Sequence, residues 1–429
     1  MGKGAHKRVM TASIAAVAAS VIGLSGCAGG GSGGAEDGTV TLEFTQWWEP
    51  ELPDGALRSL MDEFEQQNPG IKVELLSGPY SSTREQIVAG SASGTLSDVV
   101  GLDGGWVYDL VQQGAIADLS EAMQTAGYDD SQLASQVQVD GATYSIPAVN
   151  FSYMLFTNDK LLSEAGVDEP PSTRSEFLSA AEAVTEKGDA SGWALPLSLE
   201  SPVGVQNDVM SWNWASGGRM LANGQPDLTN PDVTATVDYI KQLNDAGVIA
   251  PGAANLKEQD KVEEFTNERV GMMISSLAHI NLLRENNPDL EFSVSPVPVA
   301  DGFSGTPGVT FASWGVGVSS QTEHPEEAWK LIEFLMSPEA NASLATSANG
   351  FPGNVNSEPG FDESDELYKA AYEAWQAGEP VNEFNGLPVA EQLMRIFDEE
   401  LQRSLDQGQP VPDTLAAINE QWTTELSQS

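Results

Sequence analysis

The chain has 429 residues, of which 63 are acidic and 19 are basic, so its formal net charge is −44 at pH 7. Such a field repels phosphate backbones, whereas nucleic-acid-binding proteins concentrate Lys and Arg on one face. The composition therefore argues against nucleic acid as a partner and indicates solubility outside a cell, and it says nothing about which ligand binds.

The amino terminus has the features of a secretion signal. Three basic residues precede an apolar, Ala-rich run over residues 9–24, and this run is shorter than the roughly 20 apolar residues of a membrane span. The chain's only cysteine, Cys27, then ends the sequence Leu-Ser-Gly-Cys, which resembles the bacterial lipobox. The resemblance implies cleavage after residues 1–26 and lipidation of Cys27 on the extracellular face of the cell membrane. An ordinary signal peptide followed by an incidental thiol is the alternative.

A flexible tether is expected next. Residues 27–38 are rich in Gly and Ser and cannot bury enough apolar surface to fold. About 390 residues follow, which is too many for one ordinary core and suggests two domains. No second long apolar segment occurs, so the lipid is the only membrane attachment that we expect.

The folded body begins with alternating strand and helix signals. Apolar residues alternate over 40–44 and 71–75, and between these stretches they recur at helical spacing over 57–64. A helical stretch (84–91) and a strand (98–103) follow, which predicts a parallel sheet covered by helices. Ligands of such sheets bind at the carboxyl ends of the strands. In this chain those ends are residues 46–50, 78–82 and 102–106.

A second αβ region begins near residue 150. A strand is predicted over 153–158, and Thr173 with Glu176 suits a capping box that opens a helix. Pro325 stands at the start of another helix with one apolar face. Residues 361–429 are predicted to be helical, and the chain shows no internal repeat.

Four stretches of the chain carry a family resemblance, namely residues 96–120, 141–166, 265–276 and 326–345. In their content and their order they resemble the extracellular solute-binding protein family that includes maltose-binding protein. In the second stretch, Ser145 stands where that family usually has a glycine. The resemblance spans nearly the whole mature chain.

The resemblance implies an α/β fold of the two-lobe periplasmic-binding-protein type II, with discontinuous lobes and a ligand cleft between them. The lobes would be residues 39–149 plus 304–355 and residues 150–303 plus 356–429. It further implies an extracellular lipoprotein, monomeric, that captures a carbohydrate or a related polar solute and delivers it to the membrane permease subunits of an ABC importer. No cofactor is expected.

A sugar presents C–H groups on its ring face and hydroxyls at its edge, so its site needs flat aromatic surfaces and hydrogen-bonding amides or carboxylates. The resemblance places loops with Trp47, Trp48 and Trp314 at the cleft and matches Asp103 to the family's pocket carboxylate. The candidate ligand-binding residues are Trp47, Trp48, Glu49, Tyr80, Asp103, Trp106, Asn150, Ser152, Trp193, Asn213, Trp214 and Trp314.

Several of these candidates have a structural alternative. Tryptophans also fill hydrophobic cores, which is the interpretation for Trp329, Trp375 and Trp422 at helical spacing. Adjacent residues of a strand point to opposite faces, so only one of the two neighbouring tryptophans at 47 and 48 would stack on a ligand. Asp103 could instead cap a helix, and Arg219, a weaker candidate, could be a structural ion-pair partner.

Two other functions remain open. An anchored glycoside hydrolase would use paired carboxylates, but no local motif selects a pair, and the GxSxG, HExxH and P-loop motifs are absent. His279 and His324 are the histidines left after cleavage; they are too few for a His-based metal site, and we interpret both as incidental. A sugar-binding receptor or adhesin would have the same binding fold.

Overall fold

The computed structural model describes residues 39–358, 360 and 365–429, and the predicted signal peptide, Cys27 and the whole of the predicted tether lie outside these residues. The strands are β1 (Val40–Gln46), β2 (Ile71–Ser77), β3 (Val99–Leu102), β4 (Val137–Val139), β5 (Ala142–Asn158), β6 (Ser191–Trp193), β7 (Leu221–Ala222), β8 (Gln225–Pro226), β9 (Val270–Ser276), β10 (Phe292–Ser295), β11 (Gly308–Val318), β12 (Phe351–Pro352) and β13 (Glu379–Val381).

Helices lie between and around these strands. The α-helices are α1 (Ala56–Gln67), α2 (Tyr80–Ser93), α3 (Val107–Gln112), α4 (Leu119–Ala126), α5 (Asp159–Ala165), α6 (Arg174–Lys187), α7 (Met210–Ala215), α8 (Pro231–Asp245), α9 (Glu258–Thr266), α10 (His279–Asn286), α11 (Pro325–Leu335), α12 (Pro338–Ser347), α13 (Glu366–Ala377), α14 (Ala390–Gln407) and α15 (Val411–Leu426). Short turns of helix are η1 (Glu49–Glu51), η2 (Asp130–Gln132), η3 (Val205–Val209) and η4 (Ala253–Asn255).

One mixed sheet runs through the folded body in the order β2-β1-β3-β11-β5-β9-β6. Strand β1 is parallel to both β2 and β3, with Phe44 opposite Leu75 on one side and Val99 on the other. The predicted alternation is confirmed, because Leu42 and Phe44 are fully buried while Thr41 and Glu43 are exposed. The carboxyl ends of β1, β2 and β3 therefore meet at one edge, as the sequence predicts.

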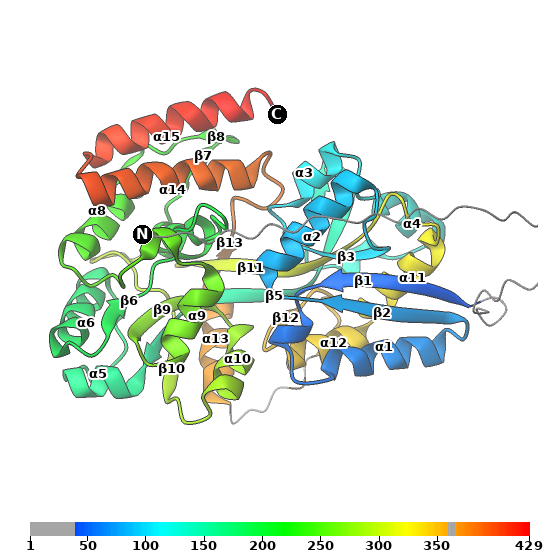
Figure 1. Cartoon of the computed structure of the whole chain (residues 1–429), viewed down its shortest axis with the longest axis horizontal. Helices are drawn as coiled ribbons and strands as arrows, with labels where there is room; N and C mark the ends of the chain where they lie inside the picture. Colours follow the sequence, from blue (N-terminus) through cyan, green and yellow to red (C-terminus); the bar gives the residue numbers. More distant parts are fainter. Residues whose placement is uncertain (1–38, 359, 361–364) are drawn as a thin grey trace, which may run out of the picture. The chain divides into compact units, whose positions relative to one another are not determined.

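The long strands β5 and β11 connect the two halves of this sheet (Figure 1). The middle of β5 pairs with β11, and its last residues pair with β9 and β10. In Figure 1, β1 and β2 lie on one side of these strands and β6 and β9 on the other. The α/β fold is thus confirmed, with a chain that crosses between two groups of strands.

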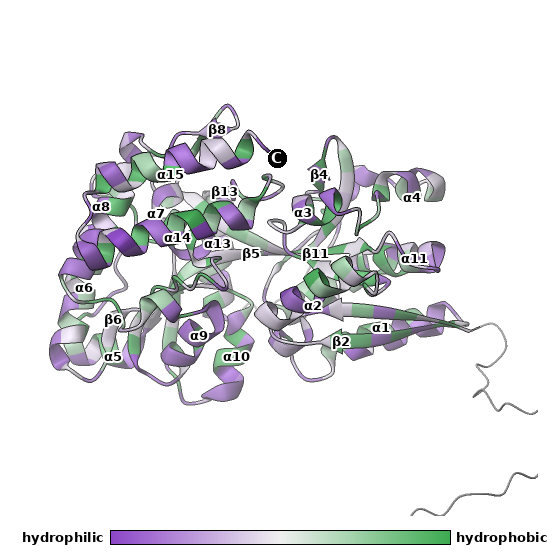
Figure 2. Cartoon of the chain, turned by 45° about the horizontal axis from the view of Figure 1, so that its top comes forward, coloured by the Kyte–Doolittle hydropathy of each residue, from purple (hydrophilic) through white to green (hydrophobic). Residues whose placement is uncertain are grey.

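Helices cover each half of the sheet and bury two large hydrophobic clusters. On the first side α1 packs against β2 and α12, and on the second side α6 packs against β6 while α14 packs against α15 and α8. The outer helices carry both hydrophilic and hydrophobic residues (Figure 2), as expected of helices that cover a sheet. The first cluster also includes Phe265 and Leu283, so the lobe boundaries given above stay a prediction.

Two predicted helix starts are confirmed. Thr173 accepts a hydrogen bond from the backbone N–H of Glu176, whose carboxylate accepts one from the backbone N–H of Thr173, which is a complete capping box at α6. Pro325 is in the first turn of α11. None of the helices in the described part of the chain is long and apolar enough to span a membrane.

Candidate functional site

A hollow lies beside the crossing strands β5 and β11, and residues from both halves of the sheet line it. Its inner part, which we call the central pocket, has a volume of about 50 Å³. An outer part of about 460 Å³ shares Trp47, Glu51, Tyr80, Glu258 and His279 with it. The central pocket is lined by Trp47, Glu51, Tyr80, Asp103, Phe151, Tyr153, Val203, Asn207, Glu258, Ser276, His279, Ala312, Ser313 and Trp314.

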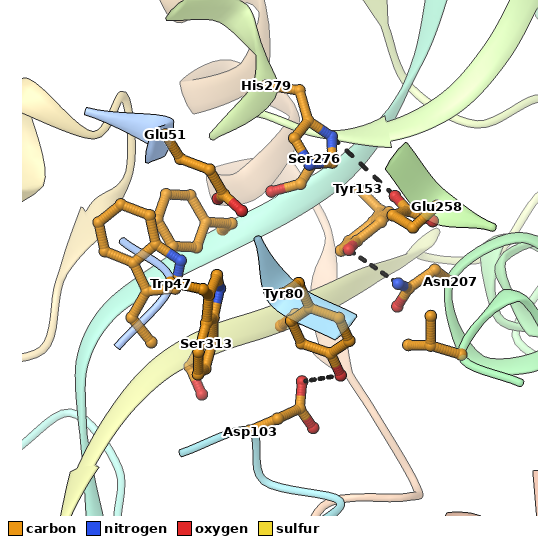
Figure 3. Close-up of a pocket in the computed structure, with 14 residues that line it drawn as sticks. Trp47, Glu51, Tyr80, Asp103, Tyr153, Asn207, Glu258, Ser276, His279 and Ser313 are labelled. Atoms are coloured by element: carbon orange, nitrogen blue, oxygen red, sulfur yellow. Dashed lines mark hydrogen bonds and ion pairs between the residues drawn. The ribbon is translucent and has the colours of Figure 1, made fainter. Parts of the chain in front are cut away.

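All three predicted strand ends contribute to this pocket. Trp47 follows β1, Tyr80 begins α2 just after β2, and Asp103 follows β3. The parallel pairing of β1 with its two neighbours brings these residues to one edge of the sheet. Figure 3 shows Tyr80 next to Asp103, with Trp47 to one side of them and Glu258 and Asn207 to the other.

Aromatic rings form one wall of the pocket. The Trp47 ring lies 5.3 Å from the rings of Tyr80 and Trp106, centroid to centroid. Trp314 stacks on Trp48 with an interplanar angle of 7° and a centroid separation of 5.4 Å. Because Trp48 is fully buried behind Trp314, the two adjacent tryptophans 47 and 48 have different positions, and only Trp47 lines the pocket.

Asp103 is held by its neighbours in a polar corner of the pocket. Its Oδ1 accepts a hydrogen bond from the backbone N–H of Gly105 at 2.8 Å, and Oδ2 accepts one from the Tyr80 hydroxyl at 3.4 Å. Burial raises the pKa of Asp103, and the hydrogen bonds from Gly105 and Tyr80 partly oppose that rise. The alternative of a helix cap is wrong, because α3 begins at Val107 without a side-chain cap. The bond from Gly105 lies within the preceding loop, and the same carboxylate lines the pocket.

Glu51 and Glu258 face the pocket from opposite halves of the sheet (Figure 3). Burial raises the pKa of Glu51 from 4.5 to about 8, and repulsion by Glu258 adds to this rise, while a hydrogen bond from Trp314 opposes it. Glu258 is the first residue of α9, and its side chain is almost fully buried. Its Oε1 has no hydrogen-bond partner among the described residues.

A fully buried lysine lies behind Glu258. Lys261 Nζ is 3.0 Å from Glu258 Oε2 and 3.0 and 3.1 Å from the two carboxylate oxygens of Asp208. It also donates to the carbonyl oxygen of Ile274 at 2.6 Å. Burial lowers the pKa of Lys261, but the charges of Asp208 and Glu258 outweigh burial, so this pKa is raised and the lysine stays charged.

His279 lines the pocket beside Glu258, contrary to our interpretation of it as incidental. Its Nδ1 is 2.7 Å from the Ser275 hydroxyl and 4.0 Å from Glu258 Oε1. Burial lowers the pKa of His279 to about 4, a shift that attraction by Glu258 opposes only in part. The imidazole is therefore neutral at pH 7. His324, in contrast, precedes α11 and does not line this pocket.

Tyr153 and Asn207 supply neutral polar groups. Asn207, in η3, donates a hydrogen bond from Nδ2 to the Tyr153 hydroxyl at 2.8 Å, and both side chains line the pocket. Ser276 and Ser313 add hydroxyls from β9 and β11. Carboxylates, hydroxyls and an amide thus surround a small space walled by aromatic rings, which suits a polar ligand with apolar faces.

The other predicted residues near the pocket lie behind its lining. Trp106 packs on Trp47 and Tyr80. Glu49 accepts a hydrogen bond from the Ser77 hydroxyl and is outside the lining, which has Glu51 instead. Asn150 and Ser152 are buried within β5, where they pair with β11.

Three predicted residues are corrected, because they belong to the hydrophobic interior. Trp193 packs against Phe177 and Trp212. Trp214 is fully buried and donates from Nε1 to Glu383 at 2.7 Å, and Asn213 is buried beside it in α7. Helices α6 and α8 cover this region, so these three residues are not part of the proposed site. Arg219, the weaker candidate, forms an ion pair with Glu379.

Sequence reasoning missed more than half of the lining. Glu51 and Ser313 are close in sequence to predicted residues, and Tyr153 follows Ser152, so each could have been added from its neighbour. Glu258 and Asn207 carry no local signal, because only the fold brings them to the pocket. The missed residues are Glu51, Phe151, Tyr153, Val203, Asn207, Glu258, Ser276, His279, Ala312 and Ser313.

Comparisons with known proteins agree with this architecture. A putative binding protein of Brucella abortus is 27% identical over 297 residues, which cover 68% of this chain and 71% of that protein. The diacetylchitobiose-binding protein DasA of Streptomyces coelicolor is 23% identical over 359 residues, which cover 80% of this chain and 81% of the relative.

A solved structure has the same fold. The ABC-transporter solute-binding protein of Thermotoga lettingae, bound with α-D-tagatose, superimposes with a TM-score of 0.77 at 22% identity, over 90% of this chain and all of that one. The profile of bacterial extracellular solute-binding proteins matches residues 59–374. The chain therefore belongs to the family of bacterial extracellular solute-binding proteins.

Proposed function

We propose that this protein captures a carbohydrate outside the cell and delivers it to the permease subunits of an ATP-driven importer, without catalysing a reaction on it. The central pocket is the observation that carries the proposal. Trp47 and Trp314 offer rings for the apolar face of a sugar. Asp103, Glu51 and Asn207 offer the acceptors and donors that its hydroxyls need.

The names of similar proteins support the same ligand class. DasA is named for a disaccharide derivative, and the Thermotoga lettingae protein holds a monosaccharide. The central pocket is small, about 50 Å³, so the ligand's entry requires the two sides to separate. We infer that they open and close about β5 and β11.

Closure would depend on contact with both sides at once. A ligand shifts an equilibrium between open and closed states only by binding one of them better. Trp47 and Asp103 belong to the side that carries β1 and β3, and Asn207 and Glu258 belong to the side that carries β9. A ligand that touches all four would stabilise the closed state.

We further propose that Cys27 is lipidated and that residues 27–38 hold a monomeric binding domain at the outer face of the cell membrane. The sequence Leu-Ser-Gly-Cys supports the modification, and the Gly/Ser-rich stretch after it supports a flexible tether. One lipid chain gives only marginal membrane binding, whereas two hold a protein stably.

Thermal-shift measurements and calorimetry with neutral mono- and oligosaccharides test the carbohydrate assignment. A sugar that binds only the folded state raises its stability by about 2.7 kcal/mol at a hundred times its Kd. The expected result is a shift for at least one sugar and no change in that sugar after incubation. The absence of any shift, or the appearance of cleavage products, would overturn the proposal.

A further inference from the structure

The hollow is lined by several acidic side chains, and the nearest lysine and arginine lie outside its lining. Glu51, Asp103 and Glu258 line the central pocket, and Glu263 adds a fourth carboxylate in the outer part. Neither part is lined by any Lys or Arg among the described residues. A neutral sugar can form hydrogen bonds with such a site, whereas a cationic ligand would also be attracted by the charge of its carboxylates.

The nearest cations are already engaged behind the lining. Lys261 is shared between Asp208 and Glu258, so one positive charge serves two carboxylates. Arg84 forms an ion pair with Glu391. His279 is neutral at pH 7, because burial lowers its pKa to about 4. Within the described ranges, the carboxyl groups of the lining therefore have no cationic side chain beside them inside the hollow.

The side chain of Glu258 has a buried carboxylate oxygen that lacks a hydrogen-bond donor within the part of the chain that the structure describes. Its relative exposure is 7%, and although Oε2 contacts Lys261, Oε1 has no hydrogen-bond partner among the described residues. On the side of Oε1, the imidazole of His279 lies 4.0 Å away. A buried carboxylate oxygen without a donor is costly, and a donor on a ligand would satisfy it.

The aromatic wall suits a cation as well as a sugar ring. The face of a Trp or Tyr ring attracts ammonium groups within about 6 Å of its centroid. Trp47, Tyr80 and Trp314 line the same pocket as Glu51 and Glu258. Charge, an unsatisfied acceptor and aromatic rings thus point to one chemical group.

We infer that the ligand is a saccharide bearing a protonated primary amine, and that Glu51 and Glu258 receive this amine. The inference rests on the proposed carbohydrate-binding function and names its substrate class. The raised pKa of Glu51 adds a consequence: at pH 7 this carboxyl holds a proton when no cation is present. An entering ammonium group displaces that proton into the solvent.

Calorimetry on the purified full chain at pH 7 tests this with matched sugars. The probes are the disaccharide of β-1,4-linked glucosamine, N,N′-diacetylchitobiose and cellobiose, which share a backbone and carry an amine, an acetamide or a hydroxyl at C2. Glucosamine against glucose and galactosamine against galactose repeat the comparison on single rings. We expect at least tenfold tighter binding of the amine, with a heat that varies with the ionisation enthalpy of the buffer.

Variants assign the preference to the carboxylates. Glu258→Gln and Glu51→Gln should each reduce the preference for the amine at least fivefold, while Glu49→Gln, in the same short helix but outside the lining, should leave it unchanged. The Glu51 variant should also remove the buffer dependence of the heat.

The outcomes separate two kinds of failure. Neutral sugars that bind as tightly as their amine counterparts would overturn the inference and leave the carbohydrate proposal intact. Failure of every neutral and amine-bearing sugar to bind would overturn the carbohydrate proposal itself.

Discussion

The raised pKa of Glu51 makes the stability of the protein depend on pH. Between pH 4.5 and 8 the folded state holds a proton on Glu51 that the unfolded chain has released, so this group lowers stability as pH rises. The rise of this pKa from 4.5 to about 8 corresponds to at most about 5 kcal/mol. Access of water to this half-buried side chain reduces the expected effect to about 2 kcal/mol.

The substitution Glu51→Gln removes the titrating group and keeps its shape. We expect the variant to match the wild-type protein within about 0.5 kcal/mol at pH 4.5 and to be more stable by about 2 kcal/mol at pH 9. Urea denaturation of both proteins across this pH range measures the difference, in which contributions from other groups cancel. Glu49→Gln is the control and should follow the wild-type curve. Parallel curves for Glu51→Gln and wild type would refute the raised pKa of this carboxyl group.

Three further outcomes follow from other contacts. Trp47→Ala should weaken saccharide binding by about 1–3 kcal/mol in calorimetry. The ring of Trp375 packs on Phe351 outside the pocket, so Trp375→Ala should leave the affinity unchanged. Equal losses of affinity in the two variants would contradict the site. Lys261→Met should lower the free energy of unfolding by about 3–5 kcal/mol, because Asp208 and Glu258 lose their cation. The control Lys160→Met breaks a surface ion pair with Glu268 and should lower the free energy of unfolding by less than about 1 kcal/mol. Cys27→Ala should move the protein from the membrane fraction of cells to the soluble one, and retention at the membrane would argue against a lipid anchor.

Local sequence patterns predicted the parts of the fold that depend on local physics. Alternation in β1, the capping box of Thr173 and the helix start at Pro325 are each set by a few neighbouring residues. Strand β5 was predicted only over 153–158 but runs from Ala142 to Asn158. It is buried on both faces, so its sequence lacks the alternation that marks a half-exposed strand.

The residues of the site also differ in whether local sequence patterns could predict them. Trp47 and Asp103 follow strands whose parallel order was predicted, and they reach the pocket as expected. Glu258 and His279 come from helices about two hundred residues further along the chain, and only the pairing of β5 with β9 brings them near. Trp193 stands in a short strand, where the sequence does not reveal that a covering helix buries it.

The most direct test of the carbohydrate-binding proposal is a crystal structure of the protein with the tightest-binding saccharide of the panel. We predict the sugar ring on Trp47, with hydrogen bonds to Asp103 from one half of the sheet and to Glu258 or Asn207 from the other. For an amine-bearing sugar, its nitrogen should lie within hydrogen-bond distance of Glu51 and Glu258. A saccharide bound elsewhere, or one that contacts only one half of the sheet, would contradict both the pocket and closure by contact with two sides.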